Sequence, residues 1–370
     1  MKTVLVSGAG VAGLTLAYWL RRNGFAPTVV ERAPAVRPGG QAIDVRGVAL
    51  DVLDRAGILE EARGARTRLR GMSMLGPEGD ERWRSTEMTF SGGRLDSADI
   101  ELLREDLTGL LHRRALDEGV EFRYDDSVAA LDERADGVRV SFERGAARTF
   151  GLVVGADGLH SNVRRLAFGP EERYVRHLGA YLTVFSADNF LDLDDWEVWL
   201  TEDSVSYCVY PVRANSELRA TLGFRSEPVA YDHRDAERQK ALMAERLAHV
   251  GWETPRLLEA MRNAPDFYFD AMAQIRMDRW TTGRVALVGD AGHSASPLSG
   301  QGTSLALVGA YVLAAELGRT PGDHTAAFAR YEARMRPFVA LNQALVDENP
   351  GGMPPEESLE KAKNGIALDG

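Results

Sequence analysis

Three glycines near the start of the chain have the spacing of a dinucleotide-binding turn. Gly8, Gly10 and Gly13 form a Gly-x-Gly-x-x-Gly motif. The first glycine permits a tight turn, the second lets the backbone approach a pyrophosphate, and the third lets a helix pack closely on a strand. The N-terminus of that helix offers N–H groups and a positive dipole end to the phosphates. Glu31 follows Gly13 by 18 residues and is placed to accept hydrogen bonds from a ribose, which disfavours a 2′-phosphate there. The motif therefore predicts a dinucleotide site.

Two further glycine-rich stretches lie far from the first and narrow the identity of the dinucleotide. They are Gly-Ala-Asp-Gly at 155–158 and Gly-Asp-Ala-Gly-His at 289–293, the second followed by Pro297, Gly300, Gln301 and Gly302. Each is a weak signal alone, because Asp-Gly turns are common. Asp290 offers a carboxylate to a sugar hydroxyl, and a helix beginning at Gly302 could direct its N-terminus to the electron-rich edge of a reduced flavin. Together the three stretches favour FAD over NAD.

The elements around the first motif are those that such a site requires. Residues 3–7 read as a buried strand, 11–23 as a helix with apolar residues at helical spacing, and 27–31 as a second strand. A strand–helix–strand unit of about 30 residues is the context in which this motif binds dinucleotides. Further helices are expected at 48–56 and 102–116, paired strands at 72–83, and short strands at 120–124, 127–132, 138–142 and 150–155.

Between residues 174 and 279 the sequence alternates between apolar and polar residues, as in an antiparallel sheet. Strands are expected at 181–186, 197–200, 206–212 and 219–224, helices at 233–249, 255–262, 302–317 and 323–345. We predict an α/β protein with a Rossmann-like FAD-binding domain, an inserted antiparallel-sheet substrate domain and a C-terminal helix. The expected divisions are 1–173 and 281–346 for the FAD-binding domain, 174–280 for the substrate domain, and 347–370 for a loose tail.

The composition argues against several other classes of protein. The formal net charge of −11 argues against nucleic acid, which demands a basic surface. Cys208 is the only cysteine, so no intramolecular disulfide can form, and the histidines lack metal-ligand spacing. The apolar start is too short for a signal peptide, and no stretch reaches the roughly 18 apolar residues of a membrane span. We expect a cytoplasmic protein, monomeric or homodimeric, without a metal or an integral membrane segment.

The three motifs, in this order, resemble those of the FAD-dependent aromatic hydroxylases, the single-component flavoprotein monooxygenases with the p-hydroxybenzoate hydroxylase fold. The resemblance extends from Met1 to about residue 345. The chain is most similar to the short members that inactivate tetracyclines or tailor polyketides, and we expect it to lack the thioredoxin-like domain of longer members. The family's chemistry is reduction of FAD by NADPH or NADH, capture of O2 as a flavin hydroperoxide, and transfer of one oxygen atom to an aromatic or enol carbon.

The resemblance also implies roles for single residues. Contacts to the FAD phosphates, ribitol or flavin ring would come from Gly8, Gly10, Ala12, Gly13, Asp44, Arg104, Asp290, Gly300 and Gly302. The adenosine end would be held by Glu31, Arg32 and the backbone of Val128. Arg37 matches a position linked to NADPH, and Asp157 belongs to a motif tied to both FAD and NADPH. Arg46 and Pro297 would lie beside the flavin ring and are the candidate catalytic residues.

Other interpretations remain for several of these residues. Arg32, Arg37 and Arg46 could be solvated loop charges, Arg104 a charge on a helix surface, and Asp44 a turn residue. His293 could donate a proton, although a structural role in its turn is the simpler interpretation. The sequence names no general base for a phenolic substrate. It also does not choose between ring hydroxylation and Baeyer–Villiger insertion, or between NADPH and NADH.

The substrate is expected between the inserted sheet and the flavin, with aromatic residues of the sheet as candidate walls. These lie at 181–185, 196–199, 207–210 and 224. Trp196 and Trp199 are superficially similar to the Trp-x-Trp box of flavin-dependent halogenases, but the residues after them and their place in the chain differ. Two other functions share the FAD motifs: a flavin reductase or dehydrogenase that passes electrons elsewhere, and a non-catalytic flavoprotein that sequesters a small molecule.

Overall fold

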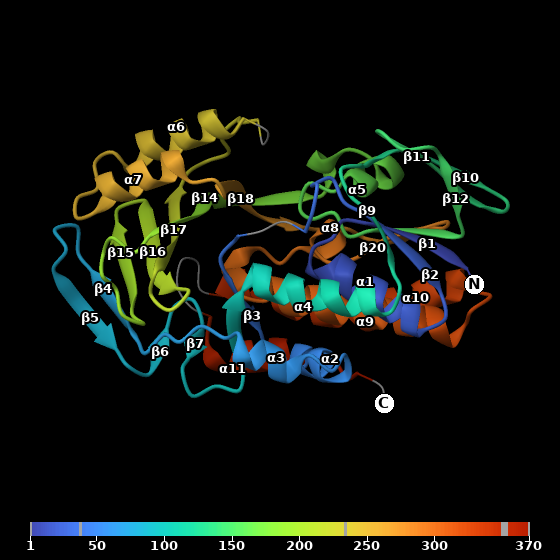
Figure 1. Ribbon diagram of the computed structural model, residues 1–370, viewed down its shortest axis with the longest axis horizontal. Helices are drawn as coiled ribbons and strands as arrows, with labels where there is room; N and C mark the ends of the chain where they lie inside the picture. Colours follow the sequence, from blue (N-terminus) through green and yellow to red (C-terminus); the bar gives the residue numbers. More distant parts are fainter. Residues whose placement is uncertain (1, 37–38, 233–234, 349–353, 369–370) are drawn as a thin grey trace.

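The computed structural model of the chain describes residues 2–36, 39–232, 235–348 and 354–368, and in it a six-stranded sheet carries the glycine-rich motifs (Figure 1). Its strand order is β19-β20-β13-β1-β2-β9, and every pair is parallel except β19–β20. The strands are β1 (Thr3–Ser7), β2 (Ala26–Val30), β9 (Glu121–Arg123), β13 (Leu152–Gly155), β19 (Thr281–Thr282) and β20 (Val285–Leu287). Because β1, β13 and β20 are parallel neighbours, the three motifs that follow them meet at one edge of the sheet.

Helices and a small antiparallel sheet pack around this six-stranded sheet. Helix α1 (Val11–Arg22) packs against α4 (Arg104–Asp117) and α9 (Gly302–Arg319), and α10 (His324–Glu348) packs against α9. Figure 1 shows these helices grouped together. Helix α9 is apolar on most sides and is buried in the core, which explains its long apolar sequence. The small sheet consists of β10 (Val128–Arg134), β11 (Gly137–Phe142) and β12 (Arg148–Phe150), with α5 (Asn162–Phe168) beside it.

A second sheet of seven strands lies at the opposite end of the molecule (Figure 1). In sheet order its strands are β18 (Tyr268–Ile275), β14 (Val175–Asp188), β17 (Glu217–Arg225), β16 (Val205–Val212), β15 (Glu197–Glu202), β4 (Met72–Leu75) and β5 (Glu81–Ser85). Helices α6 (Ala236–Leu247) and α7 (Thr254–Asn263) cover its outer face (Figure 1). Neighbouring strands are antiparallel except β15 and β4.

A two-stranded ribbon of β3 (Ala42–Val45) and β8 (Ile100–Leu103) lies between the two sheets (Figure 1). Strand β8 leads directly into α4, and β3 packs against α9. The remaining short elements are α2 (Ala49–Arg55), α3 (Leu59–Gly64), β6 (Met88–Thr89), β7 (Gly93–Arg94), η1 (Glu171–Arg173), α8 (Asp290–His293) and η2 (Pro297–Ser299).

The predicted fold class is confirmed, with differences in detail. Strand β18 lies where no strand was predicted, because its buried Asp270 and Gln274 interrupt the apolar alternation. The strand predicted at 150–155 is two strands, β12 and β13, which pair with different neighbours. Strands β4 and β5 come from the stretch assigned to the FAD-binding domain, yet they extend the seven-stranded sheet by pairing with β15.

The prediction of a loose tail is wrong for residues 354–368, which include helix α11 (Glu356–Lys363) packed against α10. Ala362 is buried, and Lys363 Nζ forms an ion pair of 3.0 Å with Asp99 Oδ2. Both charged side chains are about nine-tenths buried. A polar composition concealed this anchor, because the partner of Lys363 lies 264 residues away.

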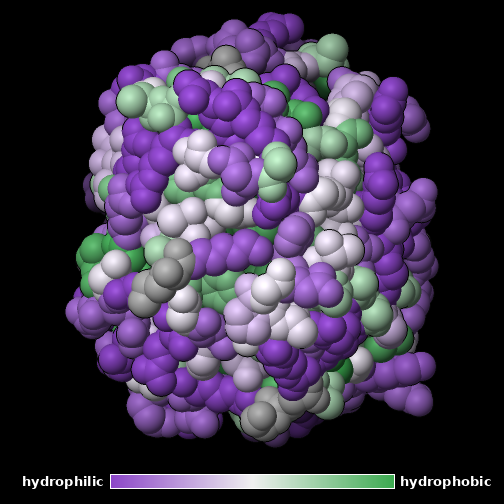
Figure 2. All heavy atoms as spheres, turned by 90° about the vertical axis from the view of Figure 1, so that its right-hand side faces the viewer, coloured by the Kyte–Doolittle hydropathy of each residue, from purple (hydrophilic) through white to green (hydrophobic). Residues whose placement is uncertain are grey.

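The surface is mainly hydrophilic where Figure 2 shows it. On that face, polar and charged side chains cover most of the area, and apolar atoms form small separate areas. Within the described residues, the structure contains no helix with the length and hydropathy that a membrane crossing needs.

Candidate cofactor site and active site

The three glycine-rich motifs contact one another at the edge where β1, β13 and β20 end. Gly8 has a φ of +103°, and a Cβ there would lie 2.5 Å from the carbonyl oxygen of Ala156 in the second motif. A Cβ on Gly289 of the third motif would lie 2.8 Å from Cβ of Ala12. Since neither position has room for a side chain, glycine is needed for the three motifs to approach this closely. The second and third motifs, which follow the first by about 150 and 280 residues in the sequence, thus form one site with it.

Gly13 is required by packing within the protein, whereas Gly10 borders open space where a ligand can bind. A Cβ on Gly13 would collide with the carbonyl oxygen of Gly8, so this glycine is required by the protein itself. A Cβ on Gly10 would meet no protein atom within 4 Å. Gly10 precedes α1 and has a φ of −82°, which other residues also adopt. Its position therefore leaves open space over the N-terminus of α1, where a pyrophosphate would be bound.

Glu31 is fixed at the end of β2, next to the first motif. Its Oε2 accepts a hydrogen bond of 2.8 Å from the N–H of Ala9, and its Oε1 accepts one of 2.9 Å from Ala33. These bonds orient the carboxylate at the site edge, where the ribose contact was predicted. Arg32 beside it is exposed, and Arg37 lies outside the described residues.

Asp157 and Val128 are engaged in contacts within the protein. Asp157 Oδ1 accepts a hydrogen bond of 2.5 Å from Ser161 Oγ, and Oδ2 accepts one of 3.0 Å from the N–H of Val163. The carbonyl oxygen of Val128 accepts a hydrogen bond from Asn162 Nδ2. These bonds tie the second motif to the start of α5. The predicted ligand contacts of Asp157 and Val128 remain predictions.

The third motif leads through an exposed turn into α9. Asp290 and Pro297 are exposed, and Gly300 adopts the left-handed conformation with a φ of +62°. Gln301 has no exposed surface, yet neither its amide nitrogen nor its amide oxygen has a hydrogen-bond partner in the described structure. A Cβ on Gly302, the first residue of α9, would meet no atom within 4 Å. The turn thus combines open space with a buried amide that lacks partners.

Asp44 and Arg46 form a buried ion pair beside this turn. Arg46 Nη2 lies 2.9 Å from Asp44 Oδ2, and both side chains are about nine-tenths buried. The Arg46 N–H donates a hydrogen bond of 3.0 Å to Ser304 Oγ, which ties β3 to α9. Among the described residues, Asp44 Oδ1 and Arg46 Nε have no hydrogen-bond partner. Burial raises the pKa of Asp44 to about 7, although the Arg46 charge opposes this shift.

Arg104 holds the loop that precedes β3. Its Nη2 donates a hydrogen bond of 2.8 Å to the carbonyl oxygen of Gly39. A Cβ on Gly40, whose φ is +101°, would lie 2.5 Å from Arg104 Nε. Arg219 from β17 donates a further bond of 3.1 Å to the carbonyl oxygen of Gly40. The start of α4 therefore positions the loop leading to Asp44, and Arg104 is more than a surface charge.

The residues along this edge fit FAD. Open space lies over the N-termini of α1 and α9, and neither helix has a side-chain cap there. The N-termini of helices attract the phosphates of a dinucleotide and the negative edge of a reduced flavin. Near this edge, Gln301, Asp44 and Arg46 carry buried polar atoms that have no hydrogen-bond partner among the described residues. Such atoms are expected where a ligand supplies the missing donors and acceptors.

The seven-stranded sheet presents its two faces to different partners. Tyr207 and Val209 of β16 belong to the core under α6 and α7. Cys208 and Tyr210, on the opposite face, pack with Leu103 of β8 and neighbouring apolar residues. Of the predicted aromatic walls, Tyr181, Phe185, Tyr207 and Phe224 are therefore core residues, and Trp199 and Tyr210 face the FAD-binding domain. Side chains alternate between the faces of a strand, so one strand supplies both sets.

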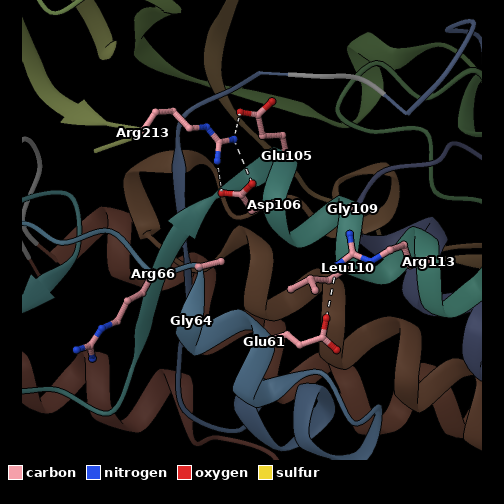
Figure 3. A pocket seen from close by; sticks show the side chains of 10 residues that line it. Glu61, Gly64, Arg66, Glu105, Asp106, Gly109, Leu110, Arg113 and Arg213 are labelled. Atoms are coloured by element: carbon pink, nitrogen blue, oxygen red, sulfur yellow. Dashed lines mark hydrogen bonds and ion pairs between the residues drawn. The ribbon is translucent and has the colours of Figure 1, made fainter. Parts of the chain in front are cut away.

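A large groove elsewhere on the surface does not match the expected substrate pocket. It measures about 510 Å³ and lies between α3, α4 and the turn after β16. Figure 3 shows Arg213 directed at Glu105 and Asp106, and Arg113 directed at Glu61. Because charged side chains line most of this groove, it offers little apolar surface to an aromatic ring.

Several buried groups near the site were missed by the sequence analysis. Glu101 and Glu197 were not singled out, and no local pattern marks a carboxylate that is buried by a distant strand. Gln301 was noted only as part of its glycine-rich motif. His293, by contrast, fits the structural interpretation: it is 1% exposed, packs on Trp280, and lies 3.2 Å from the Tyr331 hydroxyl. Burial lowers the pKa of His293 to about 4.

Comparisons with known proteins identify the family of the chain. The model of the FAD binding domain family matches residues 1–344. A protein of Mycobacterium tuberculosis is 54% identical over 370 residues, covering 100% of this chain and 99% of the relative. A flavin-dependent monooxygenase from an unknown prokaryotic organism is 42% identical over 344 residues, covering 93% and 88%.

The solved structures extend this result to the fold. The tetracycline destructase Tet(51) superposes with a TM-score of 0.90 at 35% identity, and each chain is covered completely. The agreement includes the inserted sheet and the tail as well as the glycine-rich motifs, since the whole chain is matched. The predicted family is confirmed. The chain belongs to the FAD-binding-domain family of flavin-dependent monooxygenases.

Proposed function

We propose that this protein takes electrons from NADPH or NADH and uses O2 to hydroxylate a planar aromatic or polyketide-like molecule. The observation that carries the proposal is the meeting of three motifs at one sheet edge, through Gly8 against Ala156 and Gly289 against Ala12. The ribbon of β3 and β8 connects this edge with the seven-stranded sheet: Ala42 and Leu103 pack with Trp199 and Tyr210, and a Cβ on Gly300 would lie 3.7 Å from the Arg46 guanidinium carbon. A cofactor site and an aromatic-lined face are thus adjacent, as a flavin-dependent hydroxylase requires.

Different residues at this edge would bind different parts of FAD. The N–H groups at the start of α1, with Gly10 as the open position, would bind the pyrophosphate, and Glu31 would hold the adenosine ribose. Asp290 would contact the ribitol side, and the turn from Pro297 to Gly302 would line the flavin ring. Bound FAD supplies the electron transfer and the activation of O2. The protein orients the two reactants and keeps water away from them.

We propose that Arg46 acts next to the flavin ring. A Cβ on Gly300 would lie 3.7 Å from the Arg46 guanidinium carbon. A fixed, buried cation near this turn would stabilise negative charge that develops on the cofactor or substrate. Its partner Asp44 holds the guanidinium in position through the 2.9 Å ion pair. We therefore retain Arg46 as a candidate catalytic residue and Asp44 as a cofactor contact.

The substrate class follows from the sheet face and from the similarity to tetracycline destructases. Trp199 is only partly buried, so its indole would offer a flat surface to a planar ring system, whereas Tyr210 is buried in the apolar cluster behind this face. Leu182, Val184 and Met272 form a separate buried apolar cluster, and Met272 lies close to Ser296 of the turn before η2. We propose a polycyclic compound with acidic hydroxyl groups as the substrate.

The test is the anaerobic reduction of the bound flavin by NADPH or NADH, followed by flavin absorbance, with and without phenols, anthraquinones and tetracyclines. The proposal predicts that at least one compound accelerates the reduction many-fold. Rapid reduction that no compound affects would favour a flavin reductase. Tight binding of a compound without any reduction by either nicotinamide would favour a protein that only sequesters it.

A further inference from the structure

Two carboxylates on the ribbon between the sheets have too few hydrogen-bond donors. Asp44 on β3 and Glu101 on β8 are direct cross-strand partners, so their side chains leave the same face. Glu101 Oε1 accepts a hydrogen bond of 2.7 Å from Thr67 Oγ1, whereas its Oε2 has no hydrogen-bond partner in the part of the chain that the structure describes. Asp44 Oδ1 also lacks a partner. Buried oxygens without donors are costly and rare, which marks this pair for a role beyond structure.

Glu197 of the seven-stranded sheet lies on the other side of Glu101. Asp44, Glu101 and Glu197 together form a carboxylate cluster. It has no exposed surface and accepts hydrogen bonds from the N–H of Phe90, the hydroxyl of Ser91 and the indole N–H of Trp199. A Cβ on Gly92 would lie 2.9 Å from Glu101 Oε2. The turn at residues 90–92 is thus held between Glu197 and Glu101, with the free oxygen of Glu101 beside Gly92.

Burial and the Glu197 charge oppose a negative charge on Glu101, while hydrogen bonds from Thr67 and Ser91 and the charge of Arg46 favour it. The titratable and charged groups that face it are Asp44, Arg46, Glu197, Cys208 and Tyr210. Arg46 is the cation of this set; it is 6% exposed, its ion pair goes to Asp44, and its Nε has no partner. Burial, followed by the Glu197 charge, raises the pKa of Glu101 to about 7. A carboxyl group in that range can accept and release a proton at neutral pH.

The carboxylate cluster lies between the cofactor edge and a row of aromatic rings. On one side, a Cβ on Gly300 would lie 3.7 Å from the Arg46 guanidinium carbon. On the other side Phe90 packs edge-on against Trp199 at 5.3 Å and stacks on Trp83 at 6.0 Å. Trp83 is 43% exposed, so the row reaches the surface. We expect a planar molecule bound along these rings to lie next to the turn at residues 90–92, which separates Phe90 from the buried Oε2 of Glu101.

We propose that Glu101 is the acid–base residue that removes the proton from an acidic phenol or enol hydroxyl of the substrate. This inference rests on the proposed function. The substrate O–H bond breaks, the proton forms a bond to Glu101 Oε2, and the electron pair remains on the substrate oxygen. The resulting phenolate or enolate donates electron density to the ring carbon that receives oxygen. The net charge of the site is unchanged, and Arg46 faces the new oxyanion.

The experiment compares holoenzyme of the wild type with Glu101→Gln and Glu101→Asp. Gln keeps an acceptor for Thr67 but cannot take a proton. The probe is 4-hydroxyacetophenone, whose phenolate absorbs at longer wavelength than its phenol, together with tetracycline for turnover. We expect the wild type to bind the probe as phenolate below its solution pKa, Glu101→Gln to bind it as neutral phenol, and Glu101→Asp to restore part of the ionisation.

Turnover gives an independent readout. Glu101→Gln should lower kcat about 100-fold, the lower range for loss of a general base, with little change in KM, and should remove the acidic limb of the pH profile. Thr67→Val leaves Glu101 in place but deletes its hydroxyl donor, so the limb should move to higher pH. Equal probe ionisation in wild type and Glu101→Gln, or an unmoved pH profile in both variants, would overturn the proposal.

FAD content and reduction by NADPH are measured on the same samples. If FAD is bound and reduced but neither probe binds, the acidic-hydroxyl substrate class is wrong, and the role of Glu101 is overturned while the flavoenzyme assignment stands. If FAD is not bound, or is not reduced by NADPH or NADH, the proposed function itself fails and the role of Glu101 is overturned with it.

Discussion

Replacement of Gly10 by alanine should weaken FAD binding without unfolding the protein. Its φ of −82° suits alanine, and the added methyl group would meet no protein atom within 4 Å. The change in folding free energy should stay below about 1 kcal/mol. The methyl group would instead occupy the space a pyrophosphate must enter. Loss of one N–H bond to a charged phosphate, about 1.5–3 kcal/mol, raises the Kd for FAD about 10- to 150-fold.

Gly13→Ala is the matched control for this experiment. Its methyl group would collide with the carbonyl oxygen of Gly8 inside the protein, so overpacking should destabilise the apoprotein by about 1–3 kcal/mol or more. The assays are titration of apoprotein with FAD by flavin fluorescence and thermal unfolding without FAD. The reasoning is refuted if Gly10→Ala binds FAD within about threefold of wild type, or if it destabilises the apoprotein as much as Gly13→Ala does.

Three further predictions concern charged groups. Burial raises the pKa of Glu101 from its usual 4.5 to about 7, so its protonated form stabilises the fold at low pH. Relative to Glu101→Gln, the free energy of unfolding of the wild type should fall by up to about 3 kcal/mol as pH rises from 4.5 to 7. Urea unfolding at several pH values measures this difference, and a difference that does not depend on pH would contradict the prediction. The pKa of His160 is raised to about 10 by its hydrogen bonds to Asp270 and a second carboxylate. His160→Gln should therefore destabilise most below a pH of about 6.5, and the difference should vanish as pH rises through about 10; thermal unfolding across pH tests this, and the opposite trend would refute it. Lys363→Met leaves a buried carboxylate unpaired and should cost about 3 kcal/mol in urea unfolding, whereas an unchanged midpoint would mean that α11 does not anchor the tail.

The parts of the fold that follow local rules could be predicted from the sequence. The strand–helix–strand unit around Gly8 and the helix after Gly302 depend on glycines and on apolar spacing within short segments, which the sequence displays directly. The alternation in β16 likewise predicted a sheet strand. Which face of β16 would pack under the helices could not be predicted. The alternation places Tyr207 on one face and Tyr210 on the other, and both residues are aromatic.

The parts that were missed depend on contacts between distant residues. Strand β4 pairs in parallel with β15 across more than 100 residues, and no local pattern encodes that register. A buried aspartate is unusual in a strand, so the local sequence did not predict β18. Asp270 is accommodated there because distant residues, His160 and Tyr231, form hydrogen bonds with its carboxylate. Glu101 is an ordinary charged residue in the sequence. Its pKa is raised only in the folded protein, where burial, followed by the charge of Glu197 on β15, disfavours its ionised form.

The most direct test of the account is turnover under 18O2 with NADPH and the compound that most accelerates flavin reduction. Mass spectrometry of the product should show one added oxygen atom that carries the label, with the second atom of O2 released as water. The contradictory result would be oxidation of NADPH with the compound recovered unlabelled and the label in hydrogen peroxide. That outcome would make the protein a flavin reductase or oxidase, and the aromatic-lined face next to Glu101 would need another explanation.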